Sequence, residues 1–246
     1  IWRLCTVLRA IIGLCRPAAG KRFAAPEMFF ALSYWGVTMS VRPPIVAMDL
    51  EGVLTPEVWI AFAEKTGISE LRLTTRDISD YDVLMRRRLT ILRENNLKLA
   101  DIQEVIAKME LLPGAAEYMH WLRQRYQCVI LSDTFYQFAT PFMEKLSWPT
   151  LLCNSLEVDA DGNICNYRLR LQDGKRHAVL ALKQLNFSVI AMGDSYNDTA
   201  MLAEADLGIL FRPSDKVREQ FPQFPLATDY PTVQKLIREF CLSCQY

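Results

Sequence analysis

Histidine is scarce in this chain, and neither sign of charge is in excess. The 246 residues include two histidines, His120 and His177, and Lys plus Arg equal Asp plus Glu at 28 each. A protein that binds nucleic acid needs a basic surface, so the balanced charge argues against that class. Two isolated histidines, with no second close cysteine pair, argue against a zinc site.

A repeated pattern of close cysteine pairs is also missing. The seven cysteines are odd in number and widely scattered. This distribution argues against a disulfide framework and indicates a reducing compartment, so we expect a cytoplasmic protein. Cys128 lies in an apolar stretch and is interpreted as a small core residue. Cys241 and Cys244 form a C-x-x-C near the carboxyl end and are interpreted as ordinary thiols.

The first forty residues lack an apolar run long enough to cross a membrane. Basic residues interrupt the apolar stretches at Arg3, Arg9, Arg16, Lys21 and Arg22. An arginine-bearing, acid-poor segment is compatible with a targeting peptide. However, Met39 directly precedes the first clear motif, which favours an upstream extension. Residues 1–40 are therefore left outside the predicted fold.

The most informative segment is an apolar run that ends in two acids, IVAMDLEGVLT at residues 45–55. Ile45 to Leu50 is short, apolar and partly β-branched, which predicts a buried strand. Side chains two apart in an extended segment point the same way, so Asp49 and Glu51 are expected to face one pocket. Ligands of open α/β sheets lie at such strand ends, which favours a catalytic pair. A capping pair at a strand-to-helix turn is the alternative.

A second apolar run ends in GDSYND at residues 193–198. Gly193 allows a sharp turn, and Asp194 and Asp198 are four residues apart. Together with Asp49, these acids make the oxygen-rich set that Mg²⁺ prefers.

A third apolar run, VILSDT at residues 129–134, ends in the hydroxyl of Ser132, and Lys175 and Arg176 supply cations ahead of a helix. A carboxylate nucleophile, a hydroxyl, a lysine and metal-binding acids at strand ends are the groups that phosphoryl transfer needs. The residues alone leave open which of the two cations binds phosphate.

Strands alternate with helices, which predicts an α/β fold with a doubly wound parallel sheet. The expected strands are residues 45–50, 128–132, 151–153, 189–192 and 207–210, and the expected helices are residues 58–65, 113–125, 135–146, 179–185 and one from Asn197. Asp161-Gly162-Asn163 predicts a β-hairpin within residues 156–171.

No convincing strand interrupts residues 56–109, where apolar residues recur at helical spacing. Gly67 is expected to end the first helix. We therefore expect a helical cap domain at 56–109, inserted into a core domain made of residues 41–55 and 110–246.

These motifs resemble those of the haloacid dehalogenase superfamily of aspartyl-phosphate phosphotransferases, and within it the phosphoserine phosphatase branch. The resemblance covers roughly residues 41–240 and rests on DLEGVLTPEVWIAFAEKTGI, TTRDISDYDVLMRRRL, LKLADIQEVIAKM, LSDTFY, GDSYNDTAML and FPQFP. It implies an enzyme of serine and threonine biosynthesis that uses Mg²⁺, acts on O-phosphoserine and passes the phosphate to water or homoserine. Small molecules are then the expected partners, with no membrane partner, and a homodimer is left open.

The resemblance also implies roles for single residues. Asp49 would be the nucleophile, and Glu51 would be the proton donor and acceptor. The implied phosphate- and substrate-binding residues are Ser132, Asp133, Lys175, Asn197, Arg88 and Glu57. The implied metal ligands are Asp49, Glu51, Asp194 and Asp198.

Two of these assignments have plainer alternatives. Arg88 matches the family's substrate arginine and would bind a carboxylate in a fork, but Arg86 and Arg87 adjoin it and suggest a solvated helix face. Glu57 would meet the substrate ammonium, or would be only an acidic residue at a helix N-terminus.

Glu51 departs from most relatives, which carry Asp at the second acid position. Glu has one more methylene than Asp, and Glu at this position resembles the pattern of members that also transfer phosphate to homoserine. Two other functions stay open: a phosphatase for another small phosphomonoester, such as a sugar or nucleotide phosphate, and a non-catalytic binding protein.

Overall fold

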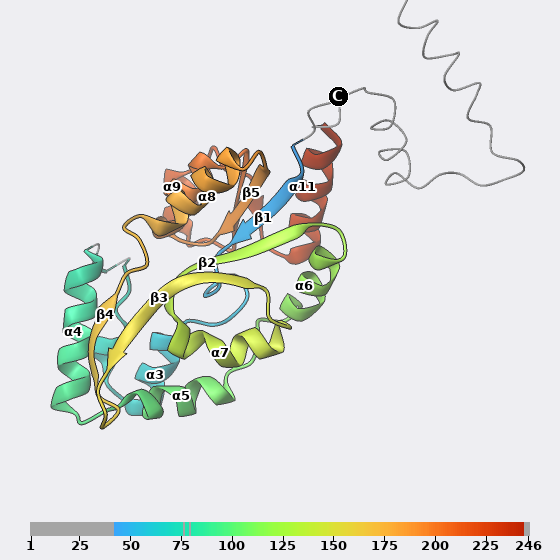
Figure 1. Ribbon diagram of the computed structural model, residues 1–246. Coiled ribbons are helices and arrows are strands. Elements are labelled where there is room, and N and C mark those ends of the chain that lie inside the picture. Colours follow the sequence, from blue (N-terminus) through green and yellow to red (C-terminus); the bar gives the residue numbers. More distant parts are fainter. Residues whose placement is uncertain (1–41, 76, 79, 244–246) are drawn as a thin grey trace, which may run out of the picture. The chain divides into compact units, whose positions relative to one another are not determined.

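The part of the chain that the structure describes is built around a seven-stranded sheet with the order β4-β3-β2-β1-β5-β6-β7 (Figure 1). The strands are β1 Pro44–Met48, β2 Gln127–Phe135, β3 Thr150–Val158, β4 Ile164–Arg168, β5 Ser188–Gly193, β6 Leu207–Phe211 and β7 Leu226–Ala227. A computed structural model describes residues 42–75, 77–78 and 80–243. The extension expected at residues 1–40, and Cys244, lie outside the described residues.

The sheet is parallel except at one edge, as the strand–helix alternation predicts. β1 lies between β2 and β5 and pairs with both in parallel, with Met48 opposite Ile130 and Met192. The next strands along the chain, β2 to β4, therefore lie on one side of β1 in the strand order, and β5 to β7 lie on the other side. β3 and β4 are antiparallel and form the predicted hairpin.

The hairpin differs from expectation in one respect. The strand expected at residues 151–153 and the first arm of the hairpin are a single continuous strand, β3. The first part of β3 pairs with β2 and its last part pairs with β4, so one strand serves two neighbours.

Both faces of the sheet are covered, which explains the continuous apolar run of β1. Alternate residues enter different clusters: Val46 and Met48 pack in one, and Ile45 and Ala47 in the other. The first cluster includes residues of the helices α6 (Ala115–Arg123) and α11 (Tyr230–Ser243). The second includes residues of α8 (Gly174–Gln184), α9 (Thr199–Glu204) and α10 (Asp215–Gln220). Figure 1 shows α8 and α9 on one side of the central strands and α6 and α11 on the other.

The described helices outside the insertion are α6 Ala115–Arg123, α7 Tyr136–Lys145, α8 Gly174–Gln184, α9 Thr199–Glu204, α10 Asp215–Gln220 and α11 Tyr230–Ser243. α6 and α7 begin and end within two residues of the expected positions, whereas α10 and α11 were not expected from the sequence. α8 begins five residues before the expected Val179, because its polar first turn has no apolar periodicity. The helix expected from Asn197 starts as the 3₁₀ turn η2 Tyr196–Asp198 and continues as α9.

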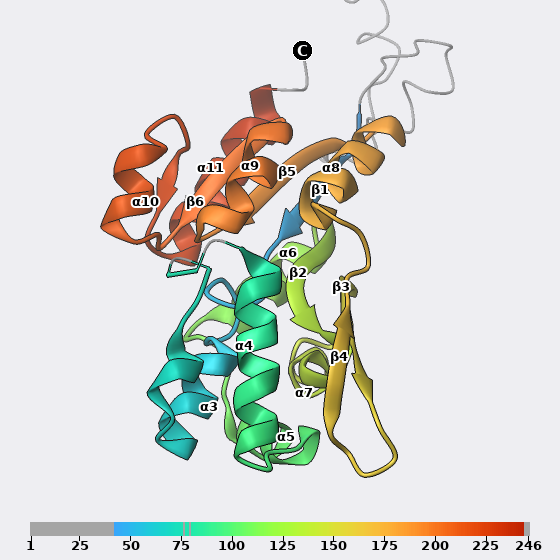
Figure 2. The same ribbon diagram turned by 90° about the vertical axis from the view of Figure 1, so that its left-hand side faces the viewer.

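The segment between β1 and α6 is helical in the described residues. It contains α3 Val58–Thr66, η1 Ser69–Arg72, α4 Tyr81–Glu94 and α5 Leu99–Lys108. Gly67 ends α3 with a φ of 72°, and its N–H donates to Ala63. Where the chain enters and leaves the insertion, the N–H of Leu112 donates to the carbonyl of Leu54 at 2.9 Å. Figure 2 shows α4 standing beside the β3–β4 hairpin.

Among the described residues, no helix has both the length and the apolar character needed to cross a membrane.

Gly208 in β6 provides a test of the packing between the sheet and α9. A Cβ at this position would lie 2.5 Å from the carbonyl oxygen of Leu202. Leu202 is buried, and the backbone of a helix packed on the sheet cannot move aside cheaply. We expect Gly208→Ala to lower the free energy of unfolding in urea by about 1–3 kcal/mol. Gly174→Ala is the control, because its nearest neighbour would be 3.9 Å away. Equal stability of the two variants would contradict this packing.

Candidate active site

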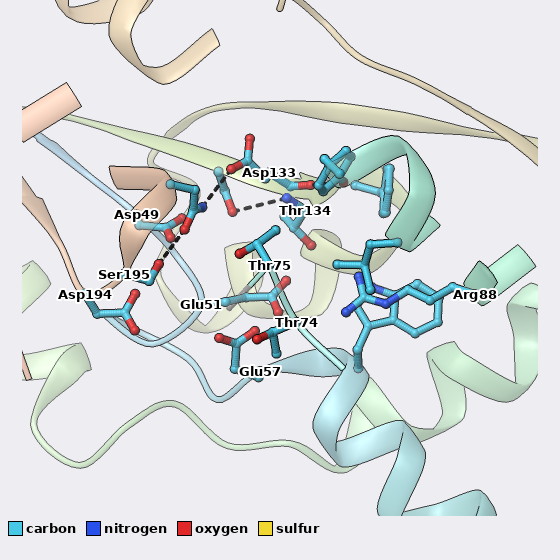
Figure 3. A pocket seen from close by; sticks show the side chains of 16 residues that line it. Asp49, Glu51, Glu57, Thr74, Thr75, Arg88, Asp133, Thr134, Asp194 and Ser195 are labelled. Atoms are coloured by element: carbon cyan, nitrogen blue, oxygen red, sulfur yellow. Dashed lines mark hydrogen bonds between the residues drawn. The ribbon is translucent and has the colours of Figure 1, made fainter. Parts of the chain in front are cut away.

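The polar residues predicted from the motifs meet where β1, β2 and β5 end. Asp49 follows β1 directly, Ser132 lies near the end of β2, and Asp194 follows β5. The strand order reverses direction at β1, because β2 and β5 lie on opposite sides of it. Open α/β sheets hold their ligands at the carboxyl end of the strands at such a point. Sixteen residues line one cavity there (Figure 3).

Three buried carboxylates form a cluster at one end of this cavity. One oxygen each of Asp49, Asp194 and Asp198 lies within 4.8 Å of the others. Gly52 makes this possible, because a Cβ there would lie 2.6 Å from the carboxyl group of Asp194. Hard oxygen donors at this spacing suit a divalent cation such as Mg²⁺.

The ammonium of Lys175, in the first turn of α8, is surrounded by carboxylates. Its Nζ lies 2.9 Å from Asp49 Oδ2, 2.8 Å from Asp198 Oδ1 and 3.5 Å from Asp133 Oδ2. Burial lowers the pKa of Lys175, but these carboxylates outweigh it and place the pKa well above its usual value. Arg176 points elsewhere and pairs with Glu204 at 3.3 Å. Of these two cations, Lys175 is therefore the one that contacts carboxylates of the cavity lining, those of Asp49 and Asp133.

The charges of this cluster do not balance within the described residues. Burial raises the pKa of Asp49 well above its usual value, Lys175 opposes this rise, and Asp198 and Asp194 add to it. One ammonium thus contacts the carboxylates of Asp49, Asp133 and Asp198, and Asp194 adds a fourth carboxylate to the same cluster. Excess negative charge and a set of hard oxygen donors are what a bound divalent cation would compensate.

Asp198 also shapes the turn that carries Asp194. It is fully buried, and its Oδ2 accepts hydrogen bonds from the backbone N–H groups of Asp194 at 3.0 Å and Ser195 at 3.1 Å. Its other oxygen faces Lys175. Asp198 therefore holds both the turn and the lysine in place.

Glu51 lies apart from the carboxylate cluster. Its Oε2 accepts the N–H of Val58, the first residue of α3, at 2.9 Å. Burial and the neighbouring Glu57 raise the pKa of Glu51 to about 7, against hydrogen bonds from Val58 and the Thr134 side chain and the charge of Arg88. The carboxyl group thus contacts a helix N-terminus and also lines the cavity, so the two interpretations of this acid are compatible. Its assignment as a metal ligand stays a prediction.

Ser132, Asp133 and Asn197 lie on the wall near Lys175. The Ser132 hydroxyl is buried and accepts the N–H of Thr134 at 3.3 Å. The side-chain amide of Asn197 donates to Asp133 Oδ2 at 2.8 Å, and Tyr81 donates to the Asp133 carbonyl at 3.0 Å. Lys175 and Asn197 therefore share one carboxylate.

Arg88 lies at the end of the cavity away from Asp49 and Asp194, with Glu51 and Glu57 between them (Figure 3). It is 6% exposed, whereas Arg86 and Arg87 are exposed, so the solvated-face alternative is wrong for Arg88. Burial lowers its pKa to about 10, and the guanidinium stays charged at neutral pH. Glu57 is the residue before α3, makes no capping hydrogen bond with its side chain, and lines the cavity.

Eight of the sixteen cavity residues were not predicted from the sequence, among them Trp59, Tyr81 and Thr134. Trp59 and Tyr81 read only as apolar positions of helices, and their cavity contacts join segments far apart in the chain. Thr134 had a local signal, because it closes the LSDT motif.

Comparisons with known proteins agree with this geometry. The model of the haloacid dehalogenase-like hydrolases matches residues 46–203. The chain is 58% identical to phosphoserine phosphatase ThrH of Pseudomonas aeruginosa over 196 residues, which are 80% of this chain and 94% of that protein. It is also 58% identical to a phosphoserine phosphatase of Pseudomonas syringae pv. tomato over 191 residues, covering 78% and 81% of the two chains.

Solved structures show the same fold at lower identity. A phospho-aspartyl intermediate analogue of phosphoserine phosphatase superposes with a TM-score of 0.65 at 19% identity, covering 79% of this chain and 99% of that one. A phosphoserine phosphatase from T. onnurineus superposes with a TM-score of 0.62 at 24% identity, covering 81% and 96%. Motifs, fold and sequence identity agree, and the chain belongs to the haloacid dehalogenase-like hydrolase family, in its phosphoserine phosphatase branch.

Proposed function

We propose that this protein removes the phosphoryl group of O-phosphoserine through an aspartyl phosphate on Asp49 and passes it to water or to homoserine. The observation that carries the proposal is the layout of the cavity. One end holds Asp49 beside Lys175, and the other holds the buried Arg88. A small molecule with a phosphate at one end and a carboxylate at the other fits this distribution of charge.

In the first half-reaction, a carboxylate oxygen of Asp49 attacks phosphorus and the bond from phosphorus to the serine oxygen breaks. Glu51 gives its proton to that oxygen, so serine leaves as a neutral alcohol. A carboxyl group with a pKa of about 7 carries a proton often enough for this role. Lys175 and the Ser132 hydroxyl stabilise the charge on the phosphoryl oxygens.

In the second half-reaction, the acceptor hydroxyl attacks the aspartyl phosphate. Glu51, now ionised, takes the proton of the acceptor, the bond from phosphorus to Asp49 breaks, and the free carboxylate is restored. Water yields inorganic phosphate, and homoserine yields phosphohomoserine.

Asp49, Asp194 and Asp198 would hold Mg²⁺, which supplies positive charge that offsets the phosphoryl oxygens when bound. Arg88 would bind the substrate carboxylate in a fork, and Glu57 its ammonium. Asp133 and Asn197 would complete the phosphate end through their contact with Lys175 and with each other.

The proposal also includes homoserine as an acceptor, a cytoplasmic location and a homodimer. The free thiols of Cys128, Cys153 and Cys165 support a reducing location. The resemblance to the phosphoserine phosphatase branch supports homoserine as the acceptor.

A product assay tests the proposed function. The protein is incubated with O-phosphoserine and Mg²⁺, with and without homoserine, and serine, phosphate and phosphohomoserine are quantified. We expect serine to equal the sum of the two phosphate-bearing products. Turnover of 4-nitrophenyl phosphate without release of serine would show instead that the substrate is another phosphomonoester.

The neighbouring cations Lys175 and Arg176 allow a matched comparison. Lys175→Met should lower kcat by about 10²–10³-fold, as does loss of one donor to transition-state charge in other enzymes. Arg176→Met should stay near wild type, because that side chain pairs with Glu204 outside the cavity. Thermal unfolding of both variants separates loss of catalysis from loss of fold. Similar activities of the two variants would contradict the assignment of Lys175.

The carboxylate cluster predicts that Mg²⁺ stabilises the folded protein as well as supporting turnover. We expect Mg²⁺ to raise the thermal midpoint of the wild type and of Asp161→Asn, a change in the exposed hairpin turn. Asp194→Asn should need more Mg²⁺ for the same rise and for half-maximal activity. The same Mg²⁺ dependence in all three proteins would rule out Asp194 as a ligand.

The length of Glu51 predicts the balance between the two acceptors. Glu51→Gln should slow both half-reactions by roughly 10²–10⁴-fold, because no group then transfers the proton. Glu51→Asp should raise the share of phosphate released to water, since a retracted carboxyl leaves room for a water beside the aspartyl phosphate. Both products are measured at fixed homoserine, with Glu64→Asp as the control, because Glu64 is an exposed residue of α3. An unchanged or lower share would assign acceptor choice to the helical insertion.

A further inference from the structure

The guanidinium of Arg88 is buried without strong partners for most of its N–H groups. Nη2 donates to the carbonyl of Leu73 at 2.8 Å, and Nη1 contacts the sulfur of Met85 at 3.7 Å. Nε has no hydrogen-bond partner among the described residues. These contacts alone leave the plane of the guanidinium weakly determined, because one good acceptor holds the position of Nη2 but still lets the group rotate.

Trp59 supplies the missing constraint. The Cζ of Arg88 lies 4.5 Å from the centre of the indole ring, and Trp59 is itself 6% exposed. A guanidinium held over an aromatic face keeps its N–H groups free at its edge, where they reach other acceptors. Both residues line the same cavity.

The indole is in turn held by rings outside its own helix. Trp59 packs edge to face on Phe138 of α7, with ring centres 5.7 Å apart, and Phe138 packs on Phe135 at 5.4 Å. Phe135 ends β2, three residues after Ser132. A continuous row of rings therefore connects the strand that carries Ser132 to the face under Arg88.

We propose that Trp59 is a positioning residue that sets the selectivity for substrates bearing a carboxylate, by fixing the guanidinium plane of Arg88. The inference rests on the proposed function. A forked pair with a carboxylate needs both groups in one plane, so an arginine without its aromatic platform binds the carboxylate less well. A phosphomonoester without a carboxylate makes no such pair and does not depend on that plane.

The test compares O-phosphoserine with O-phosphoethanolamine, which lacks the carboxylate. The kcat and KM of both substrates are measured for the wild type, Trp59→Leu, Trp59→Phe and Phe62→Leu, each with Arg88 and with Arg88→Ala. Phe62→Leu is the matched control, because Phe62 is a buried ring of the same helix that contacts Trp59 but does not line the cavity. Thermal midpoints report on folding.

We expect Trp59→Leu to lower the preference for phosphoserine roughly 10-fold, through KM, and Trp59→Phe to lower it about 3-fold, since phenyl is a weaker partner of cations than indole. Phe62→Leu should keep the preference. With Arg88→Ala already present, Trp59→Leu should not change the preference further, because the two residues act as one unit.

Three results would overturn the inference alone: a retained preference in Trp59→Leu, an equal loss in Phe62→Leu, or a further loss on top of Arg88→Ala. If Trp59→Leu does not fold, an unchanged preference in folded Trp59→Phe overturns it. A wild type that turns over phosphoethanolamine but not phosphoserine would overturn the proposed function, and this inference with it.

Discussion

The site depends on two ion pairs of the Lys175 ammonium, which is buried between Asp49 and Asp198. Three carboxylates that share a few ångströms would repel one another in a buried setting. The lysine contacts two of them at 2.9 and 2.8 Å, so that they lie close enough to act together. Because Asp198 also accepts the N–H groups of Asp194 and Ser195, the same ion pairs connect α8 to the turns after β1 and β5.

Glu51 connects this charged centre to the helical insertion. Its carboxylate accepts the first N–H of α3, and the next residue of that helix, Trp59, lies under the guanidinium of Arg88. A displacement of α3 would therefore move the proposed proton donor and the proposed carboxylate clamp together. The connection gives a physical reason why a longer acid at position 51 matters: it reaches both a helix N-terminus and the cavity.

Much of the site could be predicted from the sequence, because two simple rules give the positions of its residues. Short apolar runs predict buried strands, and the ends of parallel strands meet at one edge of the sheet, so Asp49, Ser132 and Asp194 were expected together. Lys175 could not be separated from Arg176 in this way. A step of one residue turns a helix by about 100°, and the start of α8 carries no apolar pattern that shows which side faces the sheet.

The cavity's other wall depends on contacts that no local pattern reveals. Arg88 is one of three consecutive arginines, and only the packing of α4 on Trp59 and Leu73 shows that it is the buried one. Trp59 itself reads as an ordinary apolar residue of α3. The continuity of β3 was missed for a similar reason, since its two halves pair with different strands.

The central claim is that Asp49 carries the phosphoryl group during turnover. Borohydride reduces an acyl phosphate to an alcohol, so treatment during turnover of O-phosphoserine should convert the side chain at position 49 to a primary alcohol, detected by mass spectrometry of the peptide. No conversion is expected without substrate. Conversion at another carboxylate, or none at position 49 while serine is being released, would contradict the account.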